Sequence, residues 1–347
     1  MTSRRFCQSQ KSGVGFVSNK ISDLRTWTCP GMEGGDYVNP LYYNPNYTEN
    51  FTPEFRSFID KQYSHHFEPL EVLGYIYALL YSPNYRKRYE DFLKADYPKI
   101  LFTNNKDLFR ALSLLGIELI GLHVLNQESL NHSFEKLKDA TIGESCYKEA
   151  HDCNPIIKKP AYNESEKRLY INSSAYFRGV SQEIHDYRIG GYGVLDKYLK
   201  SHKGESCDFD HVSNIIKVIA RTIEIQKTLG FLTSDLPHLK GNDSKALIQE
   251  ILQNPPPFNT NIALILSHQA KSIGDFDFDA AFISKEASDN NMVGDQLSLY
   301  SVLPNLALIC DRGSKVSPIS NVFVTNMLCD LHVNGSGSYA FLLYRLK

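Results

Sequence analysis

The stretch Tyr187–Lys200 reads YRIGGYGVLDKYLK and joins three different structural signals. A short strand is predicted over residues 185–189, and it runs into the pair Gly190-Gly191. An amphipathic helix is predicted directly after the pair, with apolar side chains on one face and lysines on the other. Glycine tolerates positive φ and close approach, and the start of a helix attracts anions, so this stretch could present amides and cations to a phosphate. The alternative is an ordinary strand-to-helix turn in which the glycines serve only geometry.

Composition places the chain among ordinary globular proteins. It has 347 residues, of which 42% are hydrophobic and 22% charged, and this is long enough for two or three domains. No apolar run approaches the roughly 18–20 residues that span a bilayer, and the positively charged N-terminus is not followed by the apolar region of a secretory signal. The seven cysteines are scattered and include no Cys-x-x-Cys pair. We therefore expect a reduced, cytoplasmic protein without a disulfide framework or a zinc ribbon.

Charge is unevenly distributed along the chain. The net charge of −2 argues against a general polyanion binder. However, residues 1–30 carry five Lys or Arg against one Asp, and residues 158–203 carry nine against five acids. Residues 275–295 are acidic, with six acids against one Lys. Such a protein can bind DNA if folding brings both basic segments onto one face, and the alternative is that these charges are simply solvated.

The order of signals predicts an α+β protein with a helical middle, an α/β segment and β-rich modules at both ends that pack together. Thr52 and Pro53 mark a helix start, Gly230 is expected to end a helix as its C-cap, and residues 126–165 are interpreted as a polar insertion. The expected domains are a β-rich module at 1–45, a helical domain at 46–150, an α/β segment with the Gly-Gly turn at 151–255, and repeated β-rich modules at 256–347. The predicted helices cover residues 54–63, 68–80, 85–93, 106–125, 210–229 and 243–253. The predicted strands in the α/β segment cover residues 169–171, 176–177 and 185–189.

A β-module is repeated in the sequence. In three places a strand, a polar or basic spacer and an aromatic, β-branched strand follow one another, and the second strand ends at Asp23, Asp289 or Asp330. Three separated copies are too few for a solenoid. They indicate one β-module used more than once.

The motifs that would indicate catalysis are weak. Asn254-Pro255-Pro256-Pro257-Phe258 only approaches the Asn-Pro-Pro-aromatic site of an adenine methyltransferase, and no glycine-rich cofactor loop follows a strand. The sequence contains no GxxxxGK(S/T) phosphate-binding loop, no HExxH zinc-binding motif and no GxSxG nucleophile elbow. His65-His66 lacks a matching ligand cluster and is interpreted as a surface pair. We expect no catalytic residue, no metal and no cofactor.

Several stretches in the same order resemble a known family. They are EVLGYIYALLYSPNYRKRYEDFLKADYPKI (71–100), DLFRALSLLGIELIGLHVL (107–125), YRIGGYGVLDKYLK (187–200) and, before the first helix, FVSNKISD (16–23) with NPLYY (39–43). Together they make about residues 1–255 resemble the C-terminal target-recognition region of bacterial restriction–modification enzymes of the type ISP kind, and of related type II fusion enzymes. The catalytic and helicase parts of that family have no counterpart here, and the β-modules after residue 258 depart from its usual order. These two departures fit a chain that is a fragment, a separate specificity subunit or a rearranged remnant of such an enzyme.

What the resemblance implies is sequence-specific recognition of duplex DNA, on behalf of adenine-methyltransferase and nuclease parts that would be the chain's partners. Phosphate contacts are expected from Lys and Arg, and base contacts from Arg, Asn, Gln or Ser. The alternative is a non-catalytic protein-interaction scaffold. Charge and position select as DNA-binding candidates Arg4, Arg5, Gln8, Lys11, Asn19, Lys20 and Arg25 in the first basic segment, and Arg178, Gln182, Arg188, Gly190, Gly191, Lys197, Lys200 and Lys203 in the second.

Overall fold

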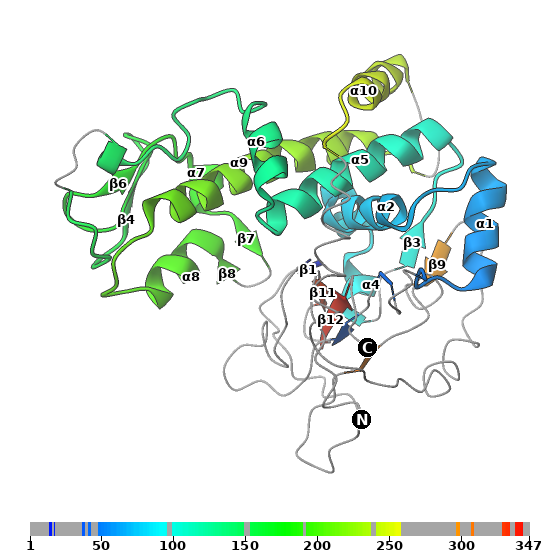
Figure 1. Cartoon of the computed structure of the whole chain (residues 1–347), viewed down its shortest axis with the longest axis horizontal. Helices are drawn as coiled ribbons and strands as arrows, with labels where there is room; N and C mark the ends of the chain where they lie inside the picture. Colours follow the sequence, from blue (N-terminus) through cyan, green and yellow to red (C-terminus); the bar gives the residue numbers. More distant parts are fainter. Residues whose placement is uncertain are drawn as a thin grey trace, which may run out of the picture. The chain divides into compact units, whose positions relative to one another are not determined.

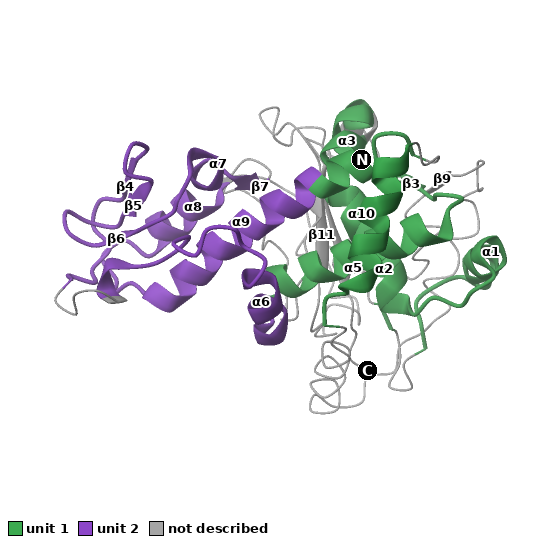
Figure 2. Cartoon of the chain, turned by 90° about the horizontal axis from the view of Figure 1, so that it is seen from above, with its two compact units in different colours: residues 1–124, 228–347 green, residues 125–227 purple. Residues whose placement is uncertain are grey.

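The computed structural model describes residues 17, 41–42, 48–95, 99–148, 153–189, 192–236 and 241–257, and the backbone alone of strands at 14–15, 37–38, 296–298, 307–308, 328–333 and 337–342. The chain divides into two compact units, of which unit 1 is residues 1–124 with 228–347 and unit 2 is residues 125–227 (Figure 2). Helices and small antiparallel sheets make up both units, which confirms the predicted α+β class. The predicted four-domain division stays a prediction.

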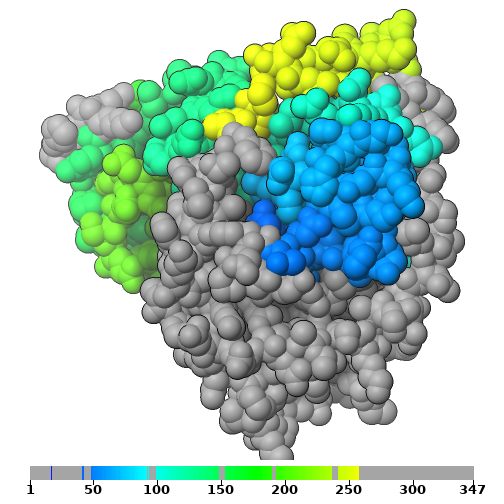
Figure 3. Space-filling model, turned by 45° about the vertical axis from the view of Figure 1, so that its right-hand side comes forward, coloured from blue at the N-terminus to red at the C-terminus, as the bar shows by residue number. Residues whose placement is uncertain are grey.

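Two packed helices form the centre of unit 1. Every residue of α2 except Glu71 is buried, and α2 packs along α5. Figure 3 shows α10, in yellow, lying against α5. The helices of this unit are α1 (Pro53–Tyr63), α2 (Pro69–Tyr81), α3 (Pro83–Arg88), α4 (Glu90–Ala95), α5 (Lys106–His123) and α10 (Asn242–Gln253), and α9 (Phe209–Leu232) crosses the boundary at residue 228 (Figure 1).

Local end signals place the first helices where the sequence predicts them. The hydroxyl of Thr52 accepts a hydrogen bond from the Phe55 N–H at 3.0 Å, and Pro53 is the first residue of α1. Ser82 ends α2 and caps α3 by accepting from the Tyr85 N–H at 3.3 Å.

The single helix predicted over 85–93 is wrong in extent. Two short helices occur instead, because the backbone leaves the helical region at Tyr89, where φ is −109°.

The two ends of the chain meet in small sheets. β1 pairs with β11, β2 with β10 and β3 with β9, all antiparallel, while β11 and β12 form a hairpin. The pairings of β1 with β11 and of β2 with β10 confirm the expectation that N-terminal and C-terminal β-segments pack together. The strands are β1 (Val14–Gly15), β2 (Tyr37–Val38), β3 (Lys99–Leu101), β9 (Gln296–Ser298), β10 (Ala307–Leu308), β11 (Leu328–Val333) and β12 (Gly337–Leu342).

The predicted repeat of the β-module is only partly covered by the described residues. Its copies that end at Asp23 and Asp289 lie outside them. The strand predicted to end at Asp330 runs on to Val333, because hairpin pairing continues past Asp330, which lies opposite Ala340.

Unit 2 is built around its own apolar core. Its elements are α6 (Gln127–Phe134), a 3-10 turn at Cys146–Lys148, β4 (Ala161–Asn163), β5 (Arg168–Tyr170), β6 (Tyr176–Phe177), α7 (Gln182–His185), β7 (Arg188–Ile189), β8 (Tyr192–Gly193), α8 (Val194–Ser201) and most of α9. Leu169 and Phe177 of the sheet are buried in this core, as is Leu199 of α8. Residues 126–165, expected to be an insertion, contribute Cys146 and Ile157 to the same core and are therefore an integral part of the unit.

Two element predictions, before β7 and at the end of α9, are wrong. The strand predicted over 185–189 is only β7, because the Ser181 hydroxyl accepts from the Ile184 N–H and starts the short helix α7 before it. Gly230 does not end a helix, since α9 continues through it to Leu232. The apolar residues on either side keep the backbone helical, because Leu229 and Leu232 are both buried.

Within the residues that the structure describes, no single helix has both the length and the apolarity needed to cross a membrane. The pair α5 and α6 reaches that length and apolarity together, but the two helices are bent by 115° relative to each other. Cys146, Cys153 and Cys207 are free thiols. Burial raises the pKa of the Cys207 thiol to about 12, so this thiol stays protonated at neutral pH.

Candidate nucleic-acid interface

Helix α8 carries two of the predicted DNA-binding lysines and is anchored in the core of unit 2. Leu195 and Leu199 are each 1% exposed and anchor the helix in the core of unit 2. Lys197 and Lys200 are exposed and stand three residues apart, so they share one side of the helix. The amphipathic pattern predicted for this helix is confirmed, and it holds both cations at the surface of a packed element.

A hairpin leads directly into this helix. In the pairing of β7 with β8, Arg188 lies opposite Gly193, and the Val194 N–H donates to the Tyr187 carbonyl at 3.1 Å. This bond places the exposed Arg188 beside the start of α8. Gly190 and Gly191, which separate the two strands in the sequence, lie outside the described residues.

The cations at the end of α8 are accessible to a ligand. Lys200 Nζ lies 2.6 Å from the Asp196 carboxylate, but the two side chains are 70% and 56% exposed. An ion pair this exposed contributes little to stability, so Lys200 can exchange its partner for a phosphate. Lys203 is exposed in the turn that follows the helix.

The remaining described candidates lie on neighbouring elements of unit 2. Gln182 is the first residue of α7 and is exposed. Arg178 directly follows β6 and is partly buried, with Nη2 3.3 Å from the Tyr176 hydroxyl. The structure thus places Arg188 on the hairpin and Lys197 and Lys200 on the helix that directly follows it, while Arg178 stands at the end of β6 in the sheet of β4, β5 and β6.

The first basic segment is not covered by the described residues. It contains the candidates Arg4, Arg5, Gln8, Lys11, Asn19, Lys20 and Arg25. Their role stays a prediction.

Sequence reasoning missed further residues on that same sheet. Arg168, Tyr170 and Tyr176 are partly exposed and alternate along β5 and β6 with the buried Leu169 and Phe177. The alternation in RLY and YF was the available signal, because side chains on a strand point to opposite faces in turn. Selecting residues by charge and position passed over all three.

Positive charge is concentrated in one part of unit 2. Residues 158–203 contain both the sheet and α8 and carry nine Lys or Arg against five acids, whereas the rest of the unit carries six against ten. The whole unit is therefore neutral, but its excess of basic over acidic residues lies in 158–203, the part that contains the sheet, the hairpin and α8. A local basic surface of this kind attracts a polyanion without a high overall charge.

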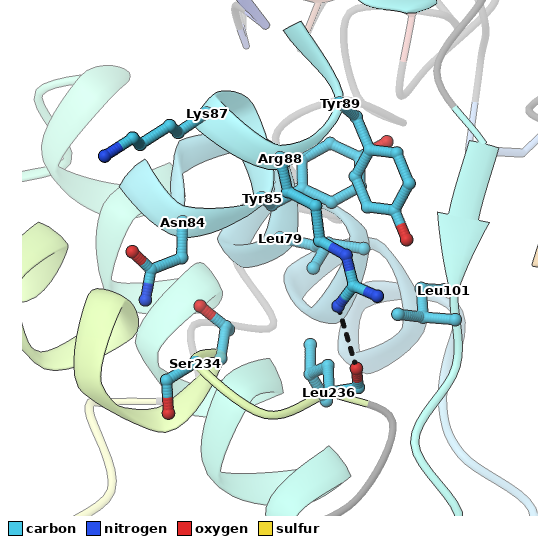
Figure 4. A pocket seen from close by; sticks show the side chains of 10 residues that line it. Leu79, Asn84, Tyr85, Lys87, Arg88, Tyr89, Leu101, Ser234 and Leu236 are labelled. Carbon is cyan, nitrogen blue, oxygen red and sulfur yellow. Dashed lines mark hydrogen bonds between the residues drawn. The ribbon is translucent and has the colours of Figure 1, made fainter.

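Unit 1 contains a separate cavity of about 420 Å³ (Figure 4). Arg88 Nη1 donates to the Leu236 carbonyl at 3.3 Å, and the guanidinium lies 5.6 Å from the centre of the Tyr89 ring. None of the described candidate residues lines this cavity. In the described part of the chain, no group of three His, Cys, Asp or Glu could hold a metal ion.

Comparison with known proteins identifies the family. The sequence profile of the Type ISP C-terminal specificity domain matches residues 1–229, which is more than half of the chain. The chain belongs to this family. Membership confirms the resemblance inferred from the sequence and gives the chain the role of a specificity domain in restriction–modification, which is a recognition role. No curated protein sequence matches the chain.

Three solved structures are similar to parts of this specificity domain. The first is a DrdV–DNA complex, with 18% identity, 56% of this chain and 21% of that chain covered, and a TM-score of 0.40. The second is a nuclease-deletion mutant of the Type ISP restriction-modification enzyme LlaGI in complex with a DNA substrate mimic, with 17% identity, 67% and 22% covered, and a TM-score of 0.37. The third is the ATP-dependent Type ISP enzyme LlaBIII bound to DNA, with 18% identity, 67% and 16% covered, and a TM-score of 0.38. The matched region spans only about a fifth of the length of these proteins.

Proposed function

We propose that this specificity domain recognises a short target sequence in duplex DNA for methyltransferase and nuclease parts of a restriction–modification system. The observation that carries the proposal is family membership, since the family is defined as the specificity domain of Type ISP enzymes. A domain that confers specificity on a DNA-modifying enzyme has to distinguish base sequences. The similar DrdV, LlaGI and LlaBIII structures are complexes with DNA or a DNA mimic.

The basic part of unit 2 supplies the contacts in this proposal. Lys197, Lys200 and Lys203 contact phosphates, because flexible ammonium groups suit charge neutralisation and carry no sequence information. Arg188 and Gln182 contact base edges in the major groove, where Arg pairs with guanine and Gln with adenine. The further proposed contacts are Arg178, Gly190 and Gly191 in unit 2, and Arg4, Arg5, Gln8, Lys11, Asn19, Lys20 and Arg25 in the first basic segment.

The proposed domain has no catalytic activity of its own. Methyl transfer and cleavage belong to the partner parts, and this chain selects where they act. Purified chain mixed with duplex DNA and S-adenosylmethionine is therefore expected to transfer no methyl group. Methylation by the chain alone would contradict this point.

Selection of bound sequences from a randomised duplex pool, repeated across a salt series, tests the proposal. We expect enrichment of a short motif, and a logarithmic affinity that falls linearly with log salt by roughly 0.9 for each phosphate contacted. Lys197→Ala should reduce this slope by about 1 without changing the motif. Arg188→Ala should weaken preference at one position of the motif, at a cost of roughly 1–3 kcal/mol. Lys61→Ala is the matched control, because Lys61 is an exposed lysine in the last turn of α1 outside both basic segments.

Absence of binding at low salt would refute DNA recognition by this chain, and the protein-interaction scaffold would become the leading hypothesis. Binding without enrichment of any motif would also refute it, because charge alone then accounts for the affinity. If Lys61→Ala changed the slope of log affinity against log salt as much as Lys197→Ala does, Lys197 would have no special role in DNA binding.

A further inference from the structure

The sheet of β4, β5 and β6 has one buried and one open face. Strand pairing sets Leu169 opposite Phe177 and Tyr170 opposite Tyr176. Leu169 and Phe177 are 2% and 0% exposed and belong to the core of unit 2. Tyr170 and Tyr176 are partly exposed, and so is Arg168. Because side chains alternate between faces along a strand, the open face presents an arginine and two tyrosines.

Two guanidinium groups lie over one aromatic ring on this open face. The guanidinium carbon of Arg168 is 4.4 Å from the centre of the Tyr176 ring, and that of Arg178 is 5.7 Å from it. Arg178 Nη2 also lies 3.3 Å from the Tyr176 hydroxyl. The Tyr170 ring is 5.4 Å from Tyr176, and its hydroxyl lies 3.4 Å from Arg168 Nη1. Cation–π attraction and these polar contacts hold both cations near the same point of the surface.

The backbone beneath these side chains is held on both sides. The Arg178 N–H donates to the Glu144 carbonyl at 2.8 Å, and the Arg178 carbonyl accepts from the Gly143 N–H at 2.9 Å. Next to Arg168, the Lys167 carbonyl accepts from the Val180 N–H at 3.0 Å. Both arginines are therefore placed by a hydrogen-bonded framework before any ligand arrives. Binding of a ligand to such a site therefore costs less side-chain entropy of the protein.

The acid on this face leaves Arg168 open to an anion. Glu166 is 3.1 Å from Arg168 Nη1 and accepts from the Tyr170 hydroxyl at 2.7 Å. The side chains of Arg168 and Glu166 are 31% and 43% exposed, so solvent weakens their ion pair. A phosphodiester can replace the carboxylate on the guanidinium, whose planar fork fits either group.

The Asn163 side chain is engaged within its own turn. The Asn163 side-chain oxygen accepts from the Ser165 hydroxyl at 2.8 Å and from the Glu166 N–H at 3.3 Å. The amide therefore serves the turn between β4 and β5 instead of a ligand. The two guanidinium groups over Tyr176 suit contact with the DNA backbone, because their planar forks bind phosphate oxygens in pairs.

We propose that Arg168 and Arg178 form a phosphate clamp for the DNA backbone, and that Tyr176 is the positioning residue that holds both guanidinium groups. The clamp rests on the proposed function, because its ligand is the DNA that the domain recognises. It adds a contact face on the sheet to the hairpin and α8. Its contribution to affinity is independent of the DNA sequence.

The salt dependence of duplex binding by the full chain tests the clamp. Arg168→Ala and Arg178→Ala should each lower the slope of log affinity against log salt by about 1, and the double variant by about 2. The enriched motif should stay that of the wild-type chain. Lys61→Ala, which removes one exposed positive charge from α1, should leave the slope unchanged. Thermal unfolding of each variant shows whether the fold is kept, and Arg178→Lys, which retains the charge, should keep the slope.

Substitution of the ring separates positioning from structure. Tyr176→Phe retains the aromatic face and should keep the wild-type slope. Tyr176→Leu removes the ring and should weaken binding several-fold, with a shallower slope, while the enriched motif is unchanged. A role in stability alone would lower the unfolding temperature of Tyr176→Leu and leave the slope of the folded protein as it was, and that result would overturn the positioning role.

The outcomes distinguish the clamp from the proposed function. Motif enrichment by the wild-type chain, combined with unchanged slopes for Arg168→Ala, Arg178→Ala and their double variant, would overturn the clamp alone. A changed motif in either variant would overturn it too, because it would indicate a base contact. A wild-type chain that binds no DNA would overturn both proposals.

Discussion

At the scale of single residues, the fold constrains the ionisation of His123 strongly. Its Nδ1 lies 2.7 Å from the Tyr77 hydroxyl, and its ring centre is 5.0 Å from that of Tyr81. The residue keeps some exposed surface, yet desolvation by the surrounding α2 and α5 side chains lowers the pKa of His123 to about 3. Since the pKa of an unfolded histidine is about 6.5, the unfolded chain binds this proton preferentially between these two values.

The stability contributed by neutral His123 is therefore complete above about pH 6.5 and is lost as the pH falls towards 3. We expect the free energy of unfolding to fall by roughly 2–4 kcal/mol over this range through this residue. His123→Gln should remove that part of the pH dependence, so that the stability difference between wild type and variant shrinks from pH 7 to pH 4. Urea unfolding at each pH measures it.

The matched control is His65→Gln, because His65 is exposed at the end of α1. This variant keeps His123, so it should retain the loss of stability between pH 7 and pH 4 that is assigned to His123. Equal behaviour of the two histidine variants would contradict the assignment to His123.

At the residue scale, the sequence predicted the exposed lysines of α8 but not the arginine–tyrosine arrangement on the sheet of β4, β5 and β6. Lys197 and Lys200 could be placed on the exposed side because a helix period is visible in eight residues. The Arg168–Tyr176–Arg178 arrangement could not be derived, because it depends on which strands pair and in what register. Gly190, Gly191 and the first basic segment lie outside the described residues, so their predicted roles stand as predictions.

At the scale of elements, α2 and α5 pack very closely against each other. A Cβ atom added to Gly116 would lie 1.8 Å from the Gly74 carbonyl oxygen, and one added to Gly74 would lie 2.5 Å from the Ser113 oxygen. Backbone atoms cannot move aside as a flexible side chain can. Glycine is thus required at both positions so that the two helices can approach each other.

Gly116→Ala should therefore destabilise the protein by roughly 3 kcal/mol or more, since the two helices must separate and lose core packing. Gly230→Ala is the matched control. It also lies within a helix, but its added Cβ would meet nothing closer than Pro83 at 3.9 Å. That substitution should stabilise by about 0.5–1 kcal/mol through the higher helix propensity of alanine. Chemical denaturation measures both, and equal effects would disprove the close contact.

Element prediction from the sequence was accurate where the signal was local. The Thr52 cap with Pro53, and the apolar period of α2, each act within a few residues, so these helices could be placed from sequence. The Gly230 C-cap and the strand over 185–189 failed for the opposite reason. Burial of Leu229 and Leu232 extends α9 through the glycine, and the Ser181 cap competes with the strand signal.

At the scale of the whole molecule, unit 1 depends on both ends of the chain. Val38 lies opposite Ala307 in the pairing of β2 with β10, although they are far apart in sequence. Opposed Cα atoms in an antiparallel pair lie about 4.5–5.5 Å apart, which suits a disulfide. The double variant Val38→Cys/Ala307→Cys should form a cross-link under mild oxidation, identified by mass spectrometry of the joined peptides.

The control pair is Val38→Cys/Ser298→Cys, because Ser298 lies opposite Lys99 in a different sheet. It should cross-link far less. Similar yields from the two pairs would mean that the two chain ends do not hold the observed register.

Unit 2 should fold without unit 1. All members of its core cluster lie within residues 125–227, including those that α9 contributes before the boundary, such as Val212 and Ile223. The cut at residue 228 removes only the last turn of α9, which belongs to unit 1. A fragment of residues 125–227 should therefore unfold cooperatively in urea, and Arg168→Ala should lower the salt slope of its DNA binding as in the full chain.

A fragment of residues 1–124 is the contrasting case. It retains β3 without its partner β9, and α5 without α10, so it should show no cooperative transition. Noncooperative unfolding of the 125–227 fragment would mean that its core needs support from unit 1. A folded 125–227 fragment that binds DNA with the full salt slope would place all the phosphate contacts in unit 2, and would remove the first basic segment from the interface.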